Sequence, residues 1–330
     1  MLFLKKLIKY SIALIFHYSG LNFYILKRTN RFYIFMFHKI SEELDLLHMS
    51  ISSEQIKHIV SWGNRYGDIV NLNEFNHKDR KSTKFCITFD DGYKNNLKFV
   101  EYCPGIKATI FLATSYIGTG KYFWADKLQS LVLSSKDMRL DLGKFDLGYF
   151  ELASTEDKKK AILELDVSIK RLHPILIEKV IREVNSQLNF NSLDTEIFLS
   201  WDDVKYLNEN GIDIGSHTHN HVITNKVTRA ELEKELQVSN AQIYKCTNQN
   251  PLYFAYPNGT INDICDSYPE ILSEFGYKAA VTTIEGCNDS VEDKYLLKRL
   301  NMTPNRITTP FGNESIAMFT TLLTNPFGIH

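Results

Sequence analysis

The 330-residue sequence has few cysteines, and none of them lies at a metal-binding or redox spacing. The five are Cys86, Cys103, Cys246, Cys265 and Cys287. Without a C-x-x-C pair or close spacing, neither a zinc knuckle nor a disulfide framework is indicated, and reduced, mostly buried thiols are expected. Reduced cysteines favour the cytoplasm only weakly, because proteins without disulfides are also exported.

The sequence also lacks an excess of either charge. Its 38 Lys and Arg residues nearly balance its 39 Asp and Glu residues, and 44% of all residues are hydrophobic. These values are typical of a globular protein and not of a disordered or nucleic-acid-coating one, so no nucleic-acid partner is expected. A chain of this length allows two domains or one large α/β barrel.

No hydrophobic run near the N-terminus is long and uniform enough for a membrane span. The longest uncharged stretch, residues 10–26, contains several polar residues, and no A-x-A-like cleavage site is present. The first forty residues nevertheless include seven Lys or Arg residues and no acidic one. We interpret residues 1–31 as a basic apolar segment, with an interfacial membrane helix, a helix packed on the main domain and an uncleaved secretion signal as alternatives. The expected location is cytoplasmic or peripheral at the cytoplasmic membrane, with export left open.

Short apolar segments alternate with helical ones along the chain. Candidate strands lie at residues 32–37, 85–89 and 108–113, around Ile212 and Ile214, and at 252–255 and 279–282. A helix is expected over residues 53–62 with Ser53 as its N-cap. Repeated strand-then-helix units predict a parallel sheet, open or closed into a barrel, with functional groups at the carboxyl ends of the strands.

Between about residues 121 and 191 the pattern changes to stretches rich in Lys, Glu and Leu that are typical of helices, such as residues 155–166 and 175–187. This segment is too long for a simple connection between barrel elements. We interpret it as a helical insert within one domain of residues 32–330. A lid beside the site and an addition without substrate contact are both open.

Two carboxylates follow the candidate strand at residues 85–89, in the sequence Thr88-Phe89-Asp90-Asp91-Gly92. Adjacent side chains on extended backbone point in opposite directions, so one can bind a metal while the other takes a proton from water. A simple Asp-Asp-Gly turn is the alternative.

A second cluster, His217-Thr218-His219-Asn220-His221, holds three of the ten histidines. Imidazole is the commonest side-chain ligand for divalent transition metals. One Asp and two His would leave coordination positions open for water and substrate. A solvated loop with incidental histidines is the alternative.

With these two motifs, the chain resembles the polysaccharide deacetylases of carbohydrate esterase family 4, the NodB homology domain. The family's Thr-Phe-Asp-Asp-Gly motif is present at residues 88–92, and its His-(Ser/Thr)-x-x-His motif at residues 217–221. The resemblance implies a distorted (β/α) barrel with Asp90 as the general base. It also implies that Asp91, His217 and His221 bind one divalent metal ion, with zinc expected and cobalt or nickel as alternatives.

The family's third motif is altered. Residues 254–259 read Phe-Ala-Tyr-Pro-Asn-Gly where many relatives have Phe-Arg-Pro-Pro-Tyr-Gly. Ala255 replaces the arginine that orients the base, and Arg299 is the candidate for supplying that charge. The altered form resembles the branch that contains the poly-N-acetylglucosamine deacetylases. Tyr256, Pro257 and Asn258 are expected to contact substrate, and the backbone N–H of Asn258 is a candidate oxyanion donor.

The family's late histidine, the general acid, has no counterpart, because the only histidine after His221 is His330. His38 lies in a Phe-His-Lys-Ile segment similar to one of the same branch and is the candidate substitute, with a strand-end residue as the alternative. Residues 200–203, Ser-Trp-Asp-Asp, indicate a capped helix start. Within them, Trp201 is a candidate for stacking on a sugar ring.

The reaction that this resemblance implies is metal-dependent hydrolysis of an N-acetyl group from a carbohydrate. A glycan or a lipid-linked sugar in cell-surface polysaccharide metabolism is the expected substrate, and no obligate protein partner is implied. The same site could serve a deformylase, an O-deacetylase or another amide hydrolase. A non-catalytic glycan-binding protein is the alternative of a different class, and the complete set of Asp90, Asp91, His217 and His221 argues against it.

Overall fold

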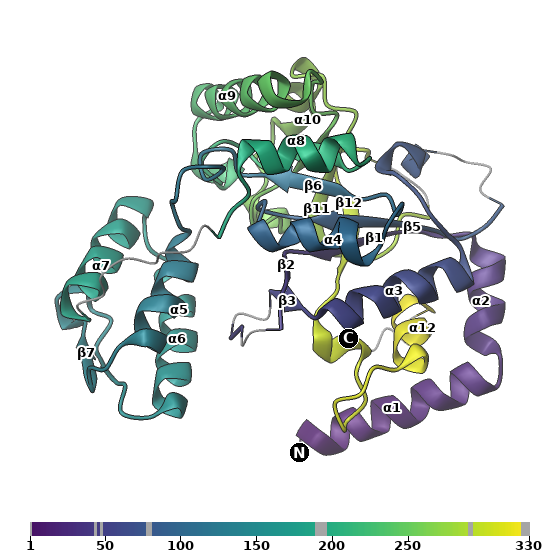
Figure 1. Ribbon diagram of the computed structural model, residues 1–330, viewed down its shortest axis with the longest axis horizontal. Coiled ribbons are helices and arrows are strands. Elements are labelled where there is room, and N and C mark those ends of the chain that lie inside the picture. Colours follow the sequence, from purple (N-terminus) through teal and green to yellow (C-terminus); the bar gives the residue numbers. More distant parts are fainter. Residues whose placement is uncertain are drawn as a thin grey trace. The chain divides into compact units, whose positions relative to one another are not determined.

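The computed structural model describes residues 2–42, 45–46, 49–76, 81–188, 197–289 and 293–324 (Figure 1). It contains two compact units. The barrel unit comprises Met1–Glu43, Met49–Thr119 and Phe198–His330, and the helical unit comprises Leu44–His48 and Gly120–Ile197. Residues 189–191 of the expected insert, and His330, lie outside the described residues.

The barrel unit is built on a parallel sheet whose strands close on themselves. Around the barrel the order is β1 (Phe32–Phe37), β12 (Leu297–Asn301), β11 (Ala279–Glu285), β10 (Tyr253–Ala255), β9 (Asp213–Ser216), β6 (Thr109–Leu112) and β5 (Lys84–Phe89). The barrel closes because β1 pairs with both β12 and β5. A short strand, β4 (Asp68–Ile69), also pairs with β5. The predicted α/β class and (β/α) barrel are therefore confirmed.

Helices and short strands surround the barrel strands in the chain order that the alternating pattern predicts. They are β2 (Lys39–Ile40), β3 (Ser50–Ile51), α3 (Ser53–Tyr66), α4 (Lys98–Tyr102), α8 (Trp201–Glu209), α9 (Arg229–Thr247), α10 (Tyr268–Glu274), α11 (Pro304–Ile307) and α12 (Ile316–Thr324). Apolar residues from six of the strands and from the segment after β4 form a buried cluster. This packing fixes the strand ends on which the candidate site stands.

The starts of two helices test the capping predictions. At α8, the Ser200 hydroxyl accepts a hydrogen bond from the Asp203 N–H at 3.2 Å, as predicted. At α3, the N-cap is Ser52 and not Ser53: its hydroxyl accepts from the Gln55 N–H at 3.1 Å, and the Gln55 side chain accepts from the Ser52 N–H. The prediction is one residue late because a capping box requires the Glu or Gln three residues after the cap.

Two N-terminal helices, α1 (Leu2–Tyr18) and α2 (Leu21–Thr29), pack on the C-terminal helix α12. Ala13 of α1 is buried against Ala317 and Met318. The Asn22 amide of α2 donates to the Thr320 hydroxyl at 3.0 Å. Among the described residues, no helix has the length and apolar character needed to cross a membrane.

The helical unit has its own hydrophobic core. It contains α5 (Trp124–Ser134), α6 (Thr155–Ile169), α7 (Pro174–Gln187) and an antiparallel hairpin of β7 (Arg139–Asp141) and β8 (Tyr149–Glu151). Leu128, Leu165 and Val184, one from each helix, are buried together. The sequence indicated α6 and α7 but not the hairpin, because its three-residue strands are shorter than the four to eight residues over which alternation can be recognised.

Candidate active site

The candidate site lies at the carboxyl ends of barrel strands, where functional groups are expected in such folds. Asp90 and Asp91 directly follow β5, His217 follows β9, and Ala255 is the last residue of β10. Because these strands are parallel neighbours or near neighbours, residues far apart in the sequence meet at one edge of the barrel.

Asp91, His217 and His221 form the only cluster of potential metal ligands within the described residues. The Nε2 atoms of the two histidines each lie 3.4 Å from Oδ1 of Asp91. In a tetrahedral site with metal–ligand bonds of about 2.0–2.2 Å, ligand atoms are themselves roughly 3.3–3.6 Å apart. The separation of the carboxylate oxygen from each imidazole therefore fits a divalent ion.

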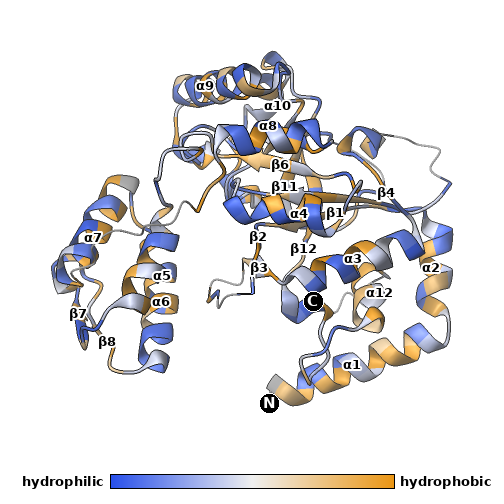
Figure 2. Ribbon diagram, in the orientation of Figure 1, coloured by the Kyte–Doolittle hydropathy of each residue, from blue (hydrophilic) through white to orange (hydrophobic). Residues whose placement is uncertain are grey.

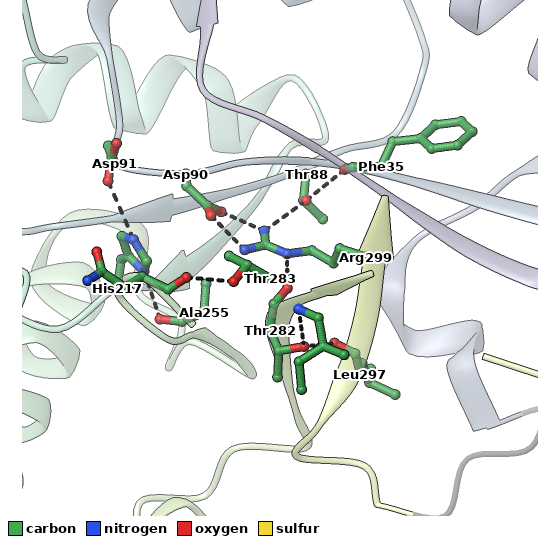
Figure 3. A network of polar contacts seen from close by, with 12 residues as sticks. Phe35, Thr88, Asp90, Asp91, His217, Ala255, Thr282, Thr283, Leu297 and Arg299 are labelled. Atoms are coloured by element: carbon green, nitrogen blue, oxygen red, sulfur yellow. Dashed lines mark hydrogen bonds and ion pairs between the residues drawn. The ribbon is translucent and has the colours of Figure 1, made fainter. Parts of the chain in front are cut away.

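The hydrogen bond made by His217 gives a second reason for this fit. Its Nδ1 lies 2.7 Å from the Ala255 carbonyl oxygen, which can only accept, so Nδ1 carries a proton (Figure 3). In neutral imidazole, Nε2 then presents a lone pair to Asp91, as in many metal-binding histidines. The Oδ1 atom of Asp91 is buried without a hydrogen-bond partner. A cation between two facing acceptors in a buried site would satisfy both of them.

Burial and neighbouring charges shift the pKa values of these three side chains. Burial acts to raise the pKa of Asp91, but the imidazoles of His217, His221 and His38 outweigh it and hold that pKa well below its usual range. Burial lowers the pKa of His221 to about 4, so this imidazole is neutral and able to ligate near neutral pH. For His217, burial acts to lower the pKa, and contact with Asp91 raises it overall. The cluster therefore carries one carboxylate and attracts positive charge.

The loops that present the cluster contain left-handed backbone at non-glycine residues. Asp91, Thr218 and His221 have φ of 76°, 63° and 56°. Such values are rare outside glycine, and for a β-branched residue such as Thr218 they mark a local strain that surrounding contacts must hold. Strain of this kind is concentrated at functional sites.

Two side chains hold the histidine loop in this conformation. The Thr218 hydroxyl accepts a hydrogen bond from the Val222 N–H at 3.0 Å. The Glu235 carboxylate, from α9, accepts from the backbone N–H groups of His219 and Asn220 at 2.9 and 2.7 Å. The family motif includes Thr218, but no local pattern in the sequence indicates Glu235, which acts from a separate helix.

The neighbouring carboxylate, Asp90, points away from Asp91 and pairs with Arg299 of β12 (Figure 3). The Arg299 Nη1 and Nη2 atoms donate to the Asp90 Oδ1 and Oδ2 atoms, each at 2.7 Å. Both side chains are almost completely buried, at 0% and 3% exposed. Burial acts to raise the pKa of Asp90, but the Arg299 charge and hydrogen bonds lower it overall, so Asp90 is ionised.

Arg299 is itself held in place by further acceptors. Its Nε atom donates to the Thr282 carbonyl at 2.7 Å, and Nη1 also donates to the Thr88 hydroxyl at 3.2 Å. Ala255 brings no charge to Asp90 and contributes only its carbonyl, to His217. The guanidinium thus reaches Asp90 from β12. Ala255, at the β10 position where many relatives have an arginine, is uncharged.

Three other candidate site residues lie outside both the metal-ligand cluster and the Asp90–Arg299 pair. His38 follows β1, which pairs with β5, and its imidazole is one of the groups that lower the pKa of Asp90 and Asp91. Asn258 is exposed, with φ of 59°. Trp201 is half-buried at the start of α8, outside the metal-ligand cluster.

Tyr256 and Pro257 differ from the expected substrate contacts, because both are buried. The Tyr256 side chain is 1% exposed and packs edge-on to Phe254 in an apolar cluster. Its ring is therefore part of the core beneath the loop and unavailable to a ligand. This burial could not be predicted from the sequence, because the residue after a short strand faces inward or outward according to how the barrel closes.

Comparison with known proteins places this geometry in context. A family model described as polysaccharide deacetylase matches residues 77–280, more than half of the chain. A curated Bacillus subtilis protein, YxkH, whose name assigns it to the polysaccharide deacetylases, is 27% identical over 114 residues. That match covers 34% of this chain and 40% of YxkH, so less than half of the relative's length is spanned.

Solved structures share the fold at low sequence identity. A polysaccharide deacetylase from Bacillus cereus, BC0361, has a TM-score of 0.55 at 15% identity, over 88% of this chain and 68% of that one. IcaB from Ammonifex degensii has a TM-score of 0.53 at 14% identity, over 83% and 93%. The Streptococcus pyogenes deacetylase PplD, in complex with acetate, has a TM-score of 0.53 at 16% identity, over 86% and 96%.

Proposed function

Because the chain belongs to the polysaccharide deacetylase family, we propose that it removes an N-acetyl group from a carbohydrate by metal-dependent hydrolysis. The single observation that carries this proposal is that two adjacent carboxylates have different partners. Asp90 is held ionised by Arg299, while Asp91 faces two imidazoles. A proton acceptor beside a metal-ligand cluster is what hydrolysis of an amide requires.

Asp91, His217 and His221 would hold the ion. A divalent ion bound there supplies Lewis-acid chemistry, since it acidifies water and polarises an acyl carbonyl. Two nitrogens and one carboxylate suit zinc, and cobalt or nickel are compatible with the same donors. The His221 side chain is 26% exposed, which leaves the cluster accessible to water and substrate.

Asp90 acts as the general base in this proposal. It takes a proton from the attacking water, and Arg299 fixes both of its oxygens so that the remaining lone pairs keep their direction. The backbone N–H of Asn258 is the candidate donor to the developing oxyanion. As the C–N bond breaks, acetate leaves and the sugar nitrogen gains a proton, for which His38 is the candidate donor.

The carbohydrate is proposed to be a glycan or lipid-linked sugar of cell-surface polysaccharide metabolism. The altered third motif, which resembles that of the poly-N-acetylglucosamine deacetylase branch, supports a poly-N-acetylglucosamine-type substrate. The presence of acetate in the complex of the structurally similar PplD supports acetate as the product.

The test measures acetate released from N-acetylated glucosamine oligosaccharides by zinc-loaded protein. The Asp90→Asn variant should lose activity but still bind zinc, whereas His217→Ala should lose both. Asp266→Asn, at an exposed aspartate, is the matched control and should retain both. Deacetylation by Asp90→Asn at the wild-type rate, or no release by the wild type from any such oligosaccharide, would reject the proposal.

A further inference from the structure

Apart from Ser11, the outward face of helix α1 is apolar, and this reverses the usual arrangement of a surface helix. Leu4, Ile8, Ile15 and Tyr18 are 59%, 53%, 66% and 82% exposed. Their spacings of four, seven and three residues place them on one side of the helix. Figure 2 shows these apolar stretches along α1.

The opposite face of α1 is held against the barrel unit by small and polar residues. Ala13 is buried against α12, the Lys6 ammonium donates to the Thr308 hydroxyl at 3.4 Å, and the His17 ring lies 3.2 Å from the Thr320 hydroxyl. These contacts fix the rotation of the helix. The apolar face therefore cannot turn inward without breaking them.

Helix α2 continues the exposed surface with aromatic residues next to cations. Phe23 and Tyr24 are 52% and 53% exposed. The Lys27 ammonium lies 5.5 Å from the centre of the Phe23 ring, and the Arg28 guanidinium lies 4.7 Å from the centre of the Tyr24 ring. Amphipathic rings and long basic side chains suit a boundary between water and an apolar phase.

One residue from a distant part of the chain extends the same surface. Phe311, which precedes α12, is 72% exposed, and its ring centre lies 6.1 Å from that of Phe3. Along α1, the outward apolar residues and the Phe3–Phe311 pair thus gather and are not scattered singly. A gathered apolar surface of this kind marks a binding site for another phase or molecule.

The charge of this region is of one sign. Residues 1–41 contain no Asp or Glu, although the whole chain has a formal net charge of only -1. Lys5, Lys27 and Arg28 are exposed on the two helices. Positive charge around an apolar surface is complementary to a layer whose interior is apolar and whose surface is anionic.

We propose that the outward residues of α1 and α2, together with Phe311, form a docking surface for an anionic lipid bilayer, here called the N-terminal face. The helices lie in the plane of the head groups, with Leu4, Ile8 and Ile15 inserted and Lys5, Lys27 and Arg28 at the phosphates. The barrel unit is thereby held at the membrane surface.

The test compares sedimentation with vesicles of phosphatidylcholine alone and of phosphatidylcholine with phosphatidylglycerol. The wild type should bind the anionic vesicles, and binding should weaken as salt is added. The combined variant Leu4→Gln, Ile8→Gln, Ile15→Gln should bind on the order of 100-fold more weakly, because these side chains enter the apolar layer. Its matched control, Tyr206→Gln, Tyr244→Gln, Leu252→Gln, replaces three exposed apolar residues elsewhere on the barrel unit and should bind as the wild type does.

A second variant separates charge from apolar insertion. Replacing Lys5, Lys27 and Arg28 by Gln should weaken binding to anionic vesicles by about 5-fold per cation removed. Replacing the exposed Lys205, Lys234 and Lys245 by Gln is the control and should have a much smaller effect. Thermal unfolding of each variant verifies that the fold is retained.

Two results would overturn the proposal. One is a wild type that stays in solution with anionic vesicles. The other is a wild type that forms a dimer by light scattering, with the Leu4, Ile8, Ile15 variant monomeric, because a second copy would then be the occupant of the N-terminal face.

Discussion

The buried charges of Asp90 and Arg299 depend on each other. Each would be strongly unfavourable alone inside the barrel, and only their bidentate contact, with the Thr282 carbonyl and the Thr88 hydroxyl, compensates for lost hydration. The pair therefore serves the stability of the barrel as well as the ionisation of Asp90. These two roles are separable by substitution.

Removing the cation should destabilise the protein. We expect Arg299→Met to lower the free energy of unfolding by about 3–5 kcal/mol, because an unpaired carboxylate remains buried. The double variant Arg299→Met, Asp90→Asn should recover part of this loss. Urea denaturation of the wild type and of both variants measures these changes in the free energy of unfolding. The control is Arg182→Met, at the exposed Arg182–Glu178 pair, which should change stability little. Equal stability of Arg299→Met and the wild type would contradict this account.

The three histidines of the loop after β9 should differ in metal binding. The His219 ring lies 2.9 Å from the Thr114 hydroxyl and is not part of the cluster. We expect His219→Ala to keep zinc affinity within a few-fold. His217→Ala and His221→Ala should each lose more than ~100-fold, since loss of even a supporting group costs about 10–100-fold. Titration calorimetry decides this, and a comparable loss in all three variants would place His219 among the ligands.

At the residue scale, the sequence indicated the candidate metal ligands and the base more readily than the residues that hold them in place. The Asp-Asp and His-x-x-x-His segments are local, so their members follow from adjacent positions in the chain. Arg299 was predicted only because Ala255 replaces the family arginine, so that another cation was needed beside Asp90. Glu235 was missed because it acts from another helix. The burial of Tyr256 was not predictable, because barrel closure, which no local pattern encodes, decides which way it faces.

Among the elements, β9 must pass close to its neighbours for His217 to reach Asp91. A Cβ atom on Gly215 would lie 2.4 and 2.6 Å from two ring carbons of Phe111 and 3.0 Å from the Tyr253 carbonyl oxygen. Glycine at this position therefore lets the strand lie against β6 and β10.

Filling that space should strain the barrel. We expect Gly215→Ala to lower the free energy of unfolding by about 1–3 kcal/mol, because a buried ring and a backbone carbonyl must move. Gly63 in α3 is the matched control: a Cβ there finds its nearest atom at 3.5 Å. Gly63→Ala should raise stability by up to about 1 kcal/mol, since alanine favours helix. Chemical denaturation gives both values, and two changes of the same sign would refute this packing argument.

Long apolar strands and capped helices were predictable from the sequence, whereas short elements were not. Strands β1, β5 and β6 were each expected within a residue or two of their observed bounds. The two-residue β4 and the hairpin of β7 and β8 carry too few residues for a period to be recognised. The pairing of β1 with both β12 and β5, which closes the barrel, joins segments too distant for any local signal.

At the scale of the whole molecule, the first two described helices pack against the last one. Helices α1 and α2 lie on α12, so they complete the barrel unit. The sequence left three alternatives for residues 1–31 because an amphipathic helix has the same pattern whether its apolar face turns inward or outward. The polar contacts of Lys6, His17 and Asn22 decide the orientation, and their partners lie about 300 residues away.

The buried Asn22 makes three side-chain hydrogen bonds to α12, and replacing it tests the packing of the N-terminal helices. Its amide donates to the Thr320 and Thr321 hydroxyls at 3.0 and 2.9 Å, and its carbonyl accepts from the Thr324 hydroxyl at 2.8 Å. Asn22→Ala should lower the free energy of unfolding by about 1–3 kcal/mol, because buried hydroxyls lose partners.

The matched control for this substitution is Asn313→Ala, at an exposed asparagine, which should change stability by less than about 0.5 kcal/mol. Unfolding followed by circular dichroism, with a dye that reports exposed apolar surface, distinguishes the two cases. If α1 and α2 are an integral part of the barrel unit, Asn22→Ala loses stability in the single transition of the whole unit. An early separate transition with an unchanged main one would instead mean that the two helices detach, and that α12 is stable without them.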